Sequence, residues 1–384
     1  MWRFVVLLSS CSMLWSCGQS DPPAQPITEL EPATSPIEVP QALTTTPLLI
    51  PDFNQAAEQI ETWVSQHHRH LQTSCQDLFS AVQRFLAEVS DANQQQAQQS
   101  WHSCYQAWNQ GLLLQQRGLT LNDSDSLQRQ RRRINVRPFQ PGYIDALPDY
   151  PYSGLIHETG LTLSLSVLTD QHQMLDLESA ALGFPALETL LWQTPLNPHW
   201  LGDTDPETPA TRRKDYLLIA NDDLSAQLQL SQARWQGAPL SSLPESVQAL
   251  WFWQSAHRLV DSDLYRFAFA PSATDEPQWH HPSWVAGSGR DHLVARLDSL
   301  LELMATSEPE TPNPLRQWID RSRLGVTADE LEEHLHHAAM ALKALPDNYP
   351  ADSTNDAELA LAQEALNALI ERLEQINAGL GQHL

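Results

Sequence analysis

Residues 180–192 read AALGFPALETLLW, an apolar run that contains a single carboxylate, Glu188. Gly183 can end one helical segment, and Pro185 suits the first turn of the next, where a missing N–H costs nothing. Glu188 then lies within about one turn of a helix N-terminus, whose partial positive charge favours a carboxylate by about 0.3–1 kcal/mol. Full burial of an unpaired charge costs several kcal/mol. Glu188 must therefore reach water, a cation, a partner side chain or a shifted pKa.

Helical spacing sharpens this requirement. Phe184, Glu188 and Leu191 share one face of a segment whose other residues are suited to a core. Two interpretations of Glu188 stay open at this point. It is either a residue of a functional site or a member of a buried ion pair or hydrogen bond.

Helical patterns extend outward from this stretch in both directions. Apolar residues between Phe53 and Leu86 recur mostly at three- and four-residue steps, which predicts a helix over about residues 52–89. Prolines exclude a continuous helix over residues 118–153, which we expect to be a long ordered loop. The other patterns predict helices over about residues 101–118, 154–172, 175–192 with an interruption near residues 183–185, 211–235, 245–268, 288–306, 327–345 and 355–379. Strand signals are scarce, so the predicted fold class is all-α.

The helices fall into two groups around a proline-rich segment at residues 194–210. Four or five helices on each side predict two antiparallel helical-bundle domains packed against each other. We place these domains at residues 51–200 and 201–384.

The N-terminus has the pattern of an export signal. Residues 1–16 combine a short positive start with an apolar run that is too short to span a bilayer. The residues before Cys17 resemble the lipobox of bacterial lipoproteins, which predicts lipidation of Cys17, with a plain signal peptide as the alternative. Residues 17–50 are rich in Pro, Thr and Ser and are expected to form a disordered tether. Together these features predict a protein on the periplasmic face of the cell envelope, anchored by lipid in the outer membrane.

Charge narrows the class of partner. The 22 Lys and Arg residues are outnumbered by 47 Asp and Glu, which gives a formal net charge of −25. Such a surface repels nucleic acid and anionic membranes and attracts cations. We therefore expect no nucleic-acid partner.

Beyond the export signal and the lipidation site Cys17, the chain has two cysteines, Cys75 and Cys104. They fall in predicted helices that a turn near residues 91–93 joins, and an antiparallel hairpin brings them within about one helical turn of each other. A disulfide is geometrically allowed in an oxidising compartment. Two buried free thiols are the alternative.

One basic cluster interrupts the acidic chain. Its arginines are suited to bind an anionic ligand, to clamp acidic groups of the second bundle, or simply to face solvent. The members are Arg129, Arg131, Arg132, Arg133 and Arg137.

The stretch GFPALETLLW resembles the hallmark of imelysin-like proteins, Gly-x-His-x-x-Glu followed by a short apolar run and an aromatic residue. Pro185 occupies the histidine position, a form similar to a branch of lipoproteins in this family. Weaker similarity covers residues 101–108 and 142–145 and most of the chain after residue 50. The residues that match the hallmark are Gly183, Glu188, Leu190, Leu191 and Trp192.

The resemblance implies an all-helical protein of two bundles, export, a site at the domain interface near the motif, and association with iron uptake. Some members are classed as metallopeptidases. Proline offers a metal no donor atom, and a zinc peptidase needs about three protein ligands and an activated water. The chain also lacks an HExxH motif.

These observations favour a non-catalytic lipoprotein that binds a small ligand or metal in iron or metal acquisition. The motif residues expected at its site are Gly183, Pro185, Glu188 and Trp192. The expected site walls are Tyr143, Asp145 and His157. Glu188 is the candidate ligand of a divalent metal or iron. Two alternatives remain, an imelysin-type metallopeptidase and an adaptor for another envelope protein.

Overall fold

The computed structural model describes residues 51–116, 124–147, 149–193, 208–269, 283–305, 313–347, 349 and 356–381. Cys17, the predicted signal peptide and the predicted tether lie outside these residues, as does the proposed domain boundary at residue 200. The described residues form helices and turns without a β-strand, so the all-α fold class is confirmed. None of the helices among them is both long and apolar enough to cross a membrane.

The first two helices form a hairpin. Helix α1 (Asn54–Ala87) buries the apolar stripe that its spacing predicts, from Ala56 to Phe85. Helix α2 (Asp91–Gln110) begins at Ser90, whose hydroxyl accepts a hydrogen bond from the Asn93 backbone N–H. A disulfide joins Cys75 of α1 to Cys104 of α2, with a Cα–Cα distance of 4.5 Å.

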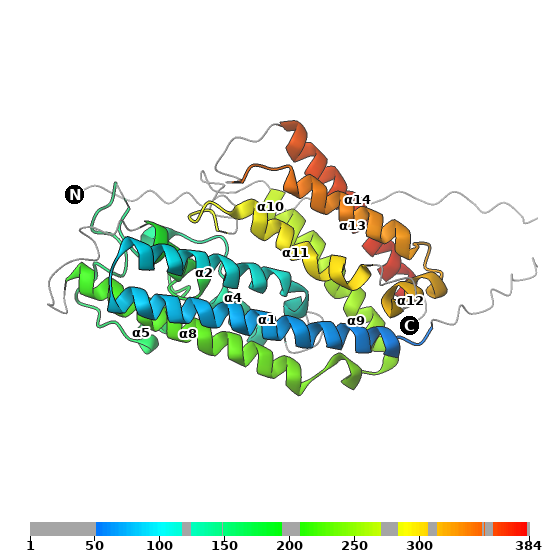
Figure 1. Ribbon diagram of the computed structural model, residues 1–384, viewed down its shortest axis with the longest axis horizontal. Coiled ribbons are helices and arrows are strands. Elements are labelled where there is room, and N and C mark those ends of the chain that lie inside the picture. The colour runs from blue at the N-terminus through cyan, green and yellow to red at the C-terminus, as the bar shows by residue number, and fades with distance from the viewer. Residues whose placement is uncertain are drawn as a thin grey trace, which may run out of the picture. The chain divides into compact units, whose positions relative to one another are not determined.

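Helix α8 (Pro209–Gly237) packs along α1 and also contacts α4 (Ser124–Ile134), α5 (Leu165–Gln171) and α6 (Phe184–Glu188) (Figure 1). Two short helices complete this part of the chain, η1 (Leu112–Gln116) and η2 (Pro141–Tyr143). A π-helical turn, η3 (Thr189–Gln193), continues α6.

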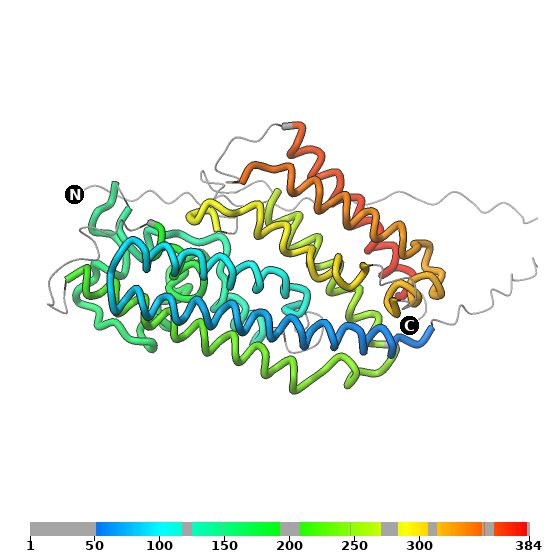
Figure 2. The backbone as a smooth tube through the Cα atoms, in the orientation of Figure 1, coloured from blue at the N-terminus to red at the C-terminus, as the bar shows by residue number. Residues whose placement is uncertain are grey.

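The C-terminal helices follow one another in close contact. They are η4 (Leu240–Ser242), α9 (Glu245–Arg258), the π-helix η5 (Leu259–Arg266), α10 (Phe267–Phe269), α11 (Gly289–Met304), α12 (Pro314–Ser322), α13 (Ala328–Lys343) and α14 (Asp356–Gly381). Figure 2 shows α13 and α14 side by side, and α14 also packs on α9. Helix α11 lies between α2 and α13 and so joins the two groups of helices.

One hydrophobic core runs from Phe53 to Leu380 and draws on both groups of helices. The division into two domains at residue 200 stays a prediction. Helix α8, although it follows that boundary, packs on α1.

Three local predictions were wrong. The helix expected over residues 175–192 begins only at Phe184, because residues 175–183 form turns and bends. The expected loop at residues 118–153 contains α4, whose Asp125 lies in the first turn and whose Arg131, Arg132 and Arg133 lie in the last. These charges match the helix dipole, but they carry no apolar period. The expected helix over residues 154–172 is reduced to α5. Arg212 donates hydrogen bonds to the carbonyls of residues 155, 156, 158 and 161, which holds this segment in turns.

Candidate functional site

The backbone path that leads into α6 depends on Gly183. Its φ is +83°, a backbone conformation that L-residues with a side chain rarely adopt. A Cβ at this position would lie 2.3 Å from the carbonyl oxygen of Ile134 and 2.5 Å from that of Arg133. Only glycine lets the chain pass so close to the end of α4.

His172 also links the segment before the motif to the end of α4. Its Nδ1 accepts a hydrogen bond from the Leu182 N–H at 3.2 Å, and its Nε2 lies 3.3 Å from the Arg132 carbonyl. Burial lowers the pKa of His172 to about 4. The neutral ring with its proton on Nε2 satisfies both contacts.

Pro185 lies in the first turn of α6, as its position in the sequence predicts. The preceding residue, Phe184, accepts a hydrogen bond on its carbonyl from the Trp101 indole at 3.3 Å. Helix α6 is therefore held against α2 at its start, and Glu188 follows one turn later.

Glu188 is fully buried, and both oxygens of its carboxylate accept hydrogen bonds from protein groups. One oxygen, Oε2, accepts a hydrogen bond from Nη2 of Arg137 at 2.7 Å. The other, Oε1, accepts from the backbone N–H groups of Val285 and Ala286 at 3.0 and 3.1 Å. Of the two interpretations left open by the sequence, the structure shows the buried ion pair. Glu188 ties α6 to the segment after α4 and to the turn before α11.

Arg137 is the partner that Glu188 positions. Its guanidinium stands 4.6 Å from the ring centroid of Phe139 and 5.6 Å from that of Tyr105. Nη2 binds Glu188, whereas Nη1 is buried without a hydrogen-bond partner. Burial alone would lower the pKa of Arg137, but its interactions with Tyr105 and Glu188 outweigh burial and raise it. Arg137 is a permanent cation with an unused donor.

A cavity of about 270 Å³ opens beside Arg137. We call it the arginine cavity, because its lining includes Arg131, Arg132, Arg137 and Arg296. Among the described residues that line it, Asp263 is the only carboxylate, and it pairs with Arg131. Four guanidinium groups therefore face one acidic side chain.

Arg296 comes to this cavity from α11. It donates to Asn109 Oδ1 at 3.0 Å and to the Asp263 carbonyl, and it lies 4.4 Å from the centroid of the Phe267 ring. Burial lowers the pKa of Arg296, and the positive charges of Arg131 and Arg137 lower it further. The sequence analysis missed this residue. A signal existed, because His292 and Arg296 are polar, four residues apart and interleaved with the apolar residues Leu293, Val294 and Leu297.

The arginines of the basic cluster differ in their surroundings. Arg133 clamps Asp223 of α8 with two hydrogen bonds of 3.0 and 2.7 Å. Arg131, Arg132 and Arg137 line the arginine cavity, and Arg129 is exposed.

Two of the three predicted wall residues, Asp145 and His157, lie together away from Glu188. Asp145 accepts two hydrogen bonds from Arg213 of α8 at 2.7 and 2.8 Å, and His157 Nε2 lies 3.3 Å from its carboxylate. The Tyr143 hydroxyl donates to the Gln171 carbonyl at 2.7 Å. Asp145 and His157 are thus brought together at Arg213, while Glu188 binds Arg137.

Trp192 lies against aromatic rings. Its ring centroid is 5.2 Å from that of Trp101 and 5.0 Å from that of His102. His102 stacks on His292, whose Nδ1 lies 2.5 Å from the Ser283 hydroxyl. Burial and the neighbouring His102 lower the pKa of His292 to about 3, so this ring is neutral.

The motif residues do not fit a metal centre. Pro185 has no donor atom, and both oxygens of Glu188 are already bound by protein donors. Across the part of the chain that the structure describes, no three His, Cys, Asp or Glu side chains are grouped so that they could hold a metal ion. This donor set falls short of the three ligands that a zinc peptidase requires.

Comparison with known proteins agrees with this fold. The family model described as Imelysin, of the peptidase family M75, matches residues 64–376. No curated protein matches the chain. An imelysin-like protein from Psychrobacter arcticum 273-4 superposes with a TM-score of 0.60 at 18% identity, over 85% of this chain and 96% of that chain.

A second solved structure is a protein named iron-regulated protein A precursor, from Parabacteroides distasonis ATCC 8503. It superposes with a TM-score of 0.63 at 13% identity, over 86% of this chain and 96% of that chain. At these identities the two structures establish the fold alone. The family model spans most of the chain, and on that ground the chain belongs to the imelysin family.

Proposed function

We propose that this protein is an exported, lipid-anchored binding protein that takes part in iron acquisition and holds an anionic ligand in the arginine cavity. One observation carries the proposal. Four arginines line one cavity of an acidic protein, and one of them, Arg137, has a buried Nη1 without a hydrogen-bond partner. Guanidinium groups bind carboxylates and phosphates through paired, charge-assisted hydrogen bonds.

Glu188 has a positioning role in this proposal. It neutralises Arg137 at Nη2 and holds this residue in the lining of the cavity. The two backbone N–H groups that also bind Glu188 belong to the turn before α11, the helix that carries Arg296. The motif carboxylate therefore holds two arginines of the site in register without touching the ligand.

The link to iron rests on the family and on the name of one structural neighbour. Ferric iron is carried by small carboxylate chelators as an anionic complex, and such a complex suits a cavity that is rich in arginine. Citrate, alone and with ferric iron, is the appropriate probe.

Titration calorimetry with citrate and with ferric citrate tests the site. Arg132→Gln removes one cavity cation that is exposed and carries no part of the core, and we expect it to weaken binding by about tenfold. Arg129→Gln removes the same charge from the same helix outside the cavity, and its affinity should match that of the parent protein. Equal losses in both variants would reduce the effect to net charge, and no binding by the parent would overturn the proposal.

The anchor is tested separately. The Cys17→Ala variant is expected to leave the membrane fraction while it retains citrate affinity, because the arginine cavity is built from residues 108–296. If the variant stays in the membrane fraction, the lipid anchor at Cys17 is wrong and the binding site is unaffected.

The metallopeptidase alternative makes a different prediction. It requires a chelator-sensitive activity and a set of metal ligands, and Glu188 already has three protein donors. We expect 1,10-phenanthroline, a chelator without carboxylates, to leave citrate binding and the melting temperature unchanged.

A further inference from the structure

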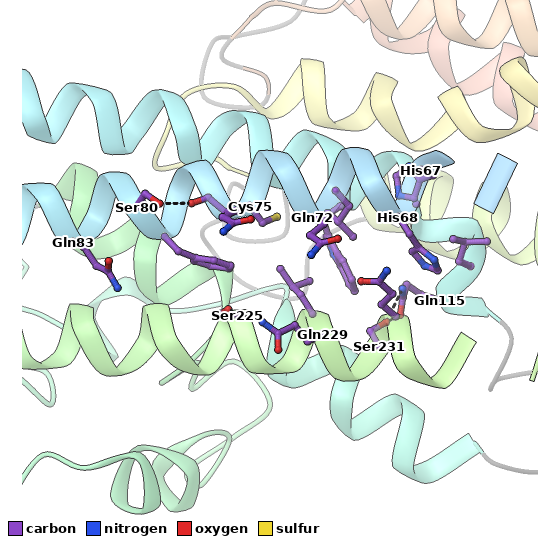
Figure 3. A pocket seen from close by; sticks show the side chains of 18 residues that line it. His67, His68, Gln72, Cys75, Ser80, Gln83, Gln115, Ser225, Gln229 and Ser231 are labelled. Atoms are coloured by element: carbon purple, nitrogen blue, oxygen red, sulfur yellow. Dashed lines mark hydrogen bonds between the residues drawn. The ribbon is translucent and has the colours of Figure 1, made fainter. Parts of the chain in front are cut away.

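A second cavity, of about 340 Å³, lies between α1, the segment after α2, and α8 (Figure 3). We call it the glutamine groove. Six glutamines and three serines line it, and none of its described lining residues is Asp, Glu, Lys or Arg. In a chain with 22 basic and 47 acidic residues, an uncharged polar lining of this length is a distinct chemical environment.

The floor of the glutamine groove holds two polar groups that lack partners. His67 is 7% exposed and its Nε2 has no hydrogen-bond partner. The indole N–H of Trp108 is also buried and unpartnered. Both residues line the groove, but these two atoms are themselves buried and are not open to it. Gly111 makes room for His67, since a Cβ there would lie 2.2 Å from Nε2.

His67 contributes no charge to the groove. Burial, together with His68 and His70, lowers the pKa of His67 to about 3, so its ring is neutral at physiological pH. Apolar surface completes the floor and comes from Leu71, Phe79 and Leu228. Above it, Gln72 of α1 and Gln229 of α8 stand on opposite sides of the opening (Figure 3).

We propose that the glutamine groove binds a neutral sugar. Amide and hydroxyl side chains donate and accept hydrogen bonds, as a ring of sugar hydroxyls requires. The apolar floor suits the C–H face of a pyranose. A charged ligand would lose its hydration with no counter-charge to replace it. The volume lies within the range of about 300–1,000 Å³ typical of small-molecule sites, so one or two sugar rings can enter.

The groove is chemically distinct from the arginine cavity. Trp108 is the residue common to the two linings, and its ring separates an uncharged site from a cationic one. Variants that test the groove therefore leave Trp108 intact. Those chosen lie on the exposed rim, where a substitution does not disturb the core.

The test is titration of the full chain with three matched probes. N-acetylglucosamine is neutral, glucosamine is its cationic counterpart, and glucuronate is a pyranose with a negative charge. We expect N-acetylglucosamine to bind and both charged sugars to bind more weakly by about tenfold, because neither charge finds a partner. Absence of N-acetylglucosamine binding at millimolar concentration, or equal affinity for glucuronate, overturns the proposal.

Matched variants locate the binding. Gln72→Leu on α1 and Gln229→Leu on α8 each remove hydrogen bonds from the rim, and each should weaken N-acetylglucosamine binding by about fivefold. The controls Gln66→Leu and Gln236→Leu change exposed glutamines of the same two helices outside the groove and should leave affinity unchanged. Losses in the controls equal to those in the rim variants place the sugar elsewhere. Arg132→Gln should leave sugar affinity unchanged, which separates this result from the test of the arginine cavity.

Discussion

Arg137 and Glu188 form an ion pair of 2.7 Å between side chains that are 2% and 0% exposed. A pair buried to this degree affects the stability of the fold mainly through the cost of removing one partner. Removal of one partner leaves an uncompensated charge in the core, which costs about 3–5 kcal/mol. Because one member comes from the motif and the other lines the arginine cavity, the pair connects the family hallmark to the proposed site.

The first prediction concerns this pair. Glu188→Ala leaves Arg137 and two backbone N–H groups without an acceptor, so we expect a loss of about 3–5 kcal/mol in the free energy of unfolding. Urea denaturation measures it. The double variant Arg137→Met with Glu188→Leu removes both charges and should recover most of the loss. Glu58→Ala, an exposed carboxylate on α1, is the control and should stay close to the parent. A stable Glu188→Ala protein would contradict the structural role.

The second prediction concerns Gly183. Gly183→Ala places a Cβ against two carbonyl oxygens of α4 at a positive φ, so we expect destabilisation of about 2–3 kcal/mol. Gly237→Ala is the matched control, because nothing lies within 4 Å of a Cβ there and its φ is not positive. That variant should be neutral or more stable by up to about 1 kcal/mol. Equal stabilities in urea would show that the chain does not cross α4 at Gly183.

The sequence predicted the elements whose apolar residues repeat locally. Helices α1 and α2 follow from such spacing, as does the helical start at Pro185. Helix α4 was not predicted because its arginines show no apolar period. Residues 154–164 were wrongly predicted to be helical, because local patterns do not reveal the hydrogen bonds that the distant Arg212 donates to this segment. When a side chain from another helix binds several backbone carbonyls, the sequence of the bound segment shows no periodic pattern.

The site shows the same limit. The sequence showed that Glu188 needs a partner, but Arg137 lies 51 residues away and the amides of Val285 and Ala286 lie 97 and 98 residues away. Spacing rules act over one or two helical turns, so they could not choose between a site residue and an ion pair. Asp145 and His157, taken as walls of the same site, instead meet Arg213 of α8, a helix assigned to the other domain.

The third prediction concerns acid. The folded protein holds His67 and His292 neutral with pKa values of about 3, and His172 with a pKa of about 4. The unfolded chain binds protons to these rings near pH 6.5, so stability is full above about pH 6.5 and falls as the pH drops from there toward about 3–4. Each ring contributes a slope of up to about 1.4 kcal/mol per pH unit. Urea denaturation at pH 7, where stability is full, and at pH 6 and 5, where it falls, measures this slope.

A variant assigns part of this slope. His292→Gln removes one of the titrating rings, so its stability should fall less steeply below about pH 6.5 than that of the parent, by about one proton. The variant loses the contact with Ser283 at every pH, which lowers its stability but not its slope. An unchanged slope would mean that His292 is protonated in the folded state.

The last prediction concerns the disulfide between Cys75 and Cys104. The bond closes a loop with a sequence separation of 29, and loops of this size stabilise a fold by about 2–4 kcal/mol through the entropy of the unfolded chain. The double variant Cys75→Ala with Cys104→Ala should lose that amount in urea, and reductant should destabilise the parent but not the variant. Cys75 also lines the glutamine groove, so sugar affinity is measured alongside stability in the same variant. Sugar affinity should change little in the variant under native conditions, since neither sulfur offers the ligand a strong hydrogen bond, whereas citrate affinity should not change at all. A reductant effect that persists in the double variant would show that the stabilisation comes from elsewhere.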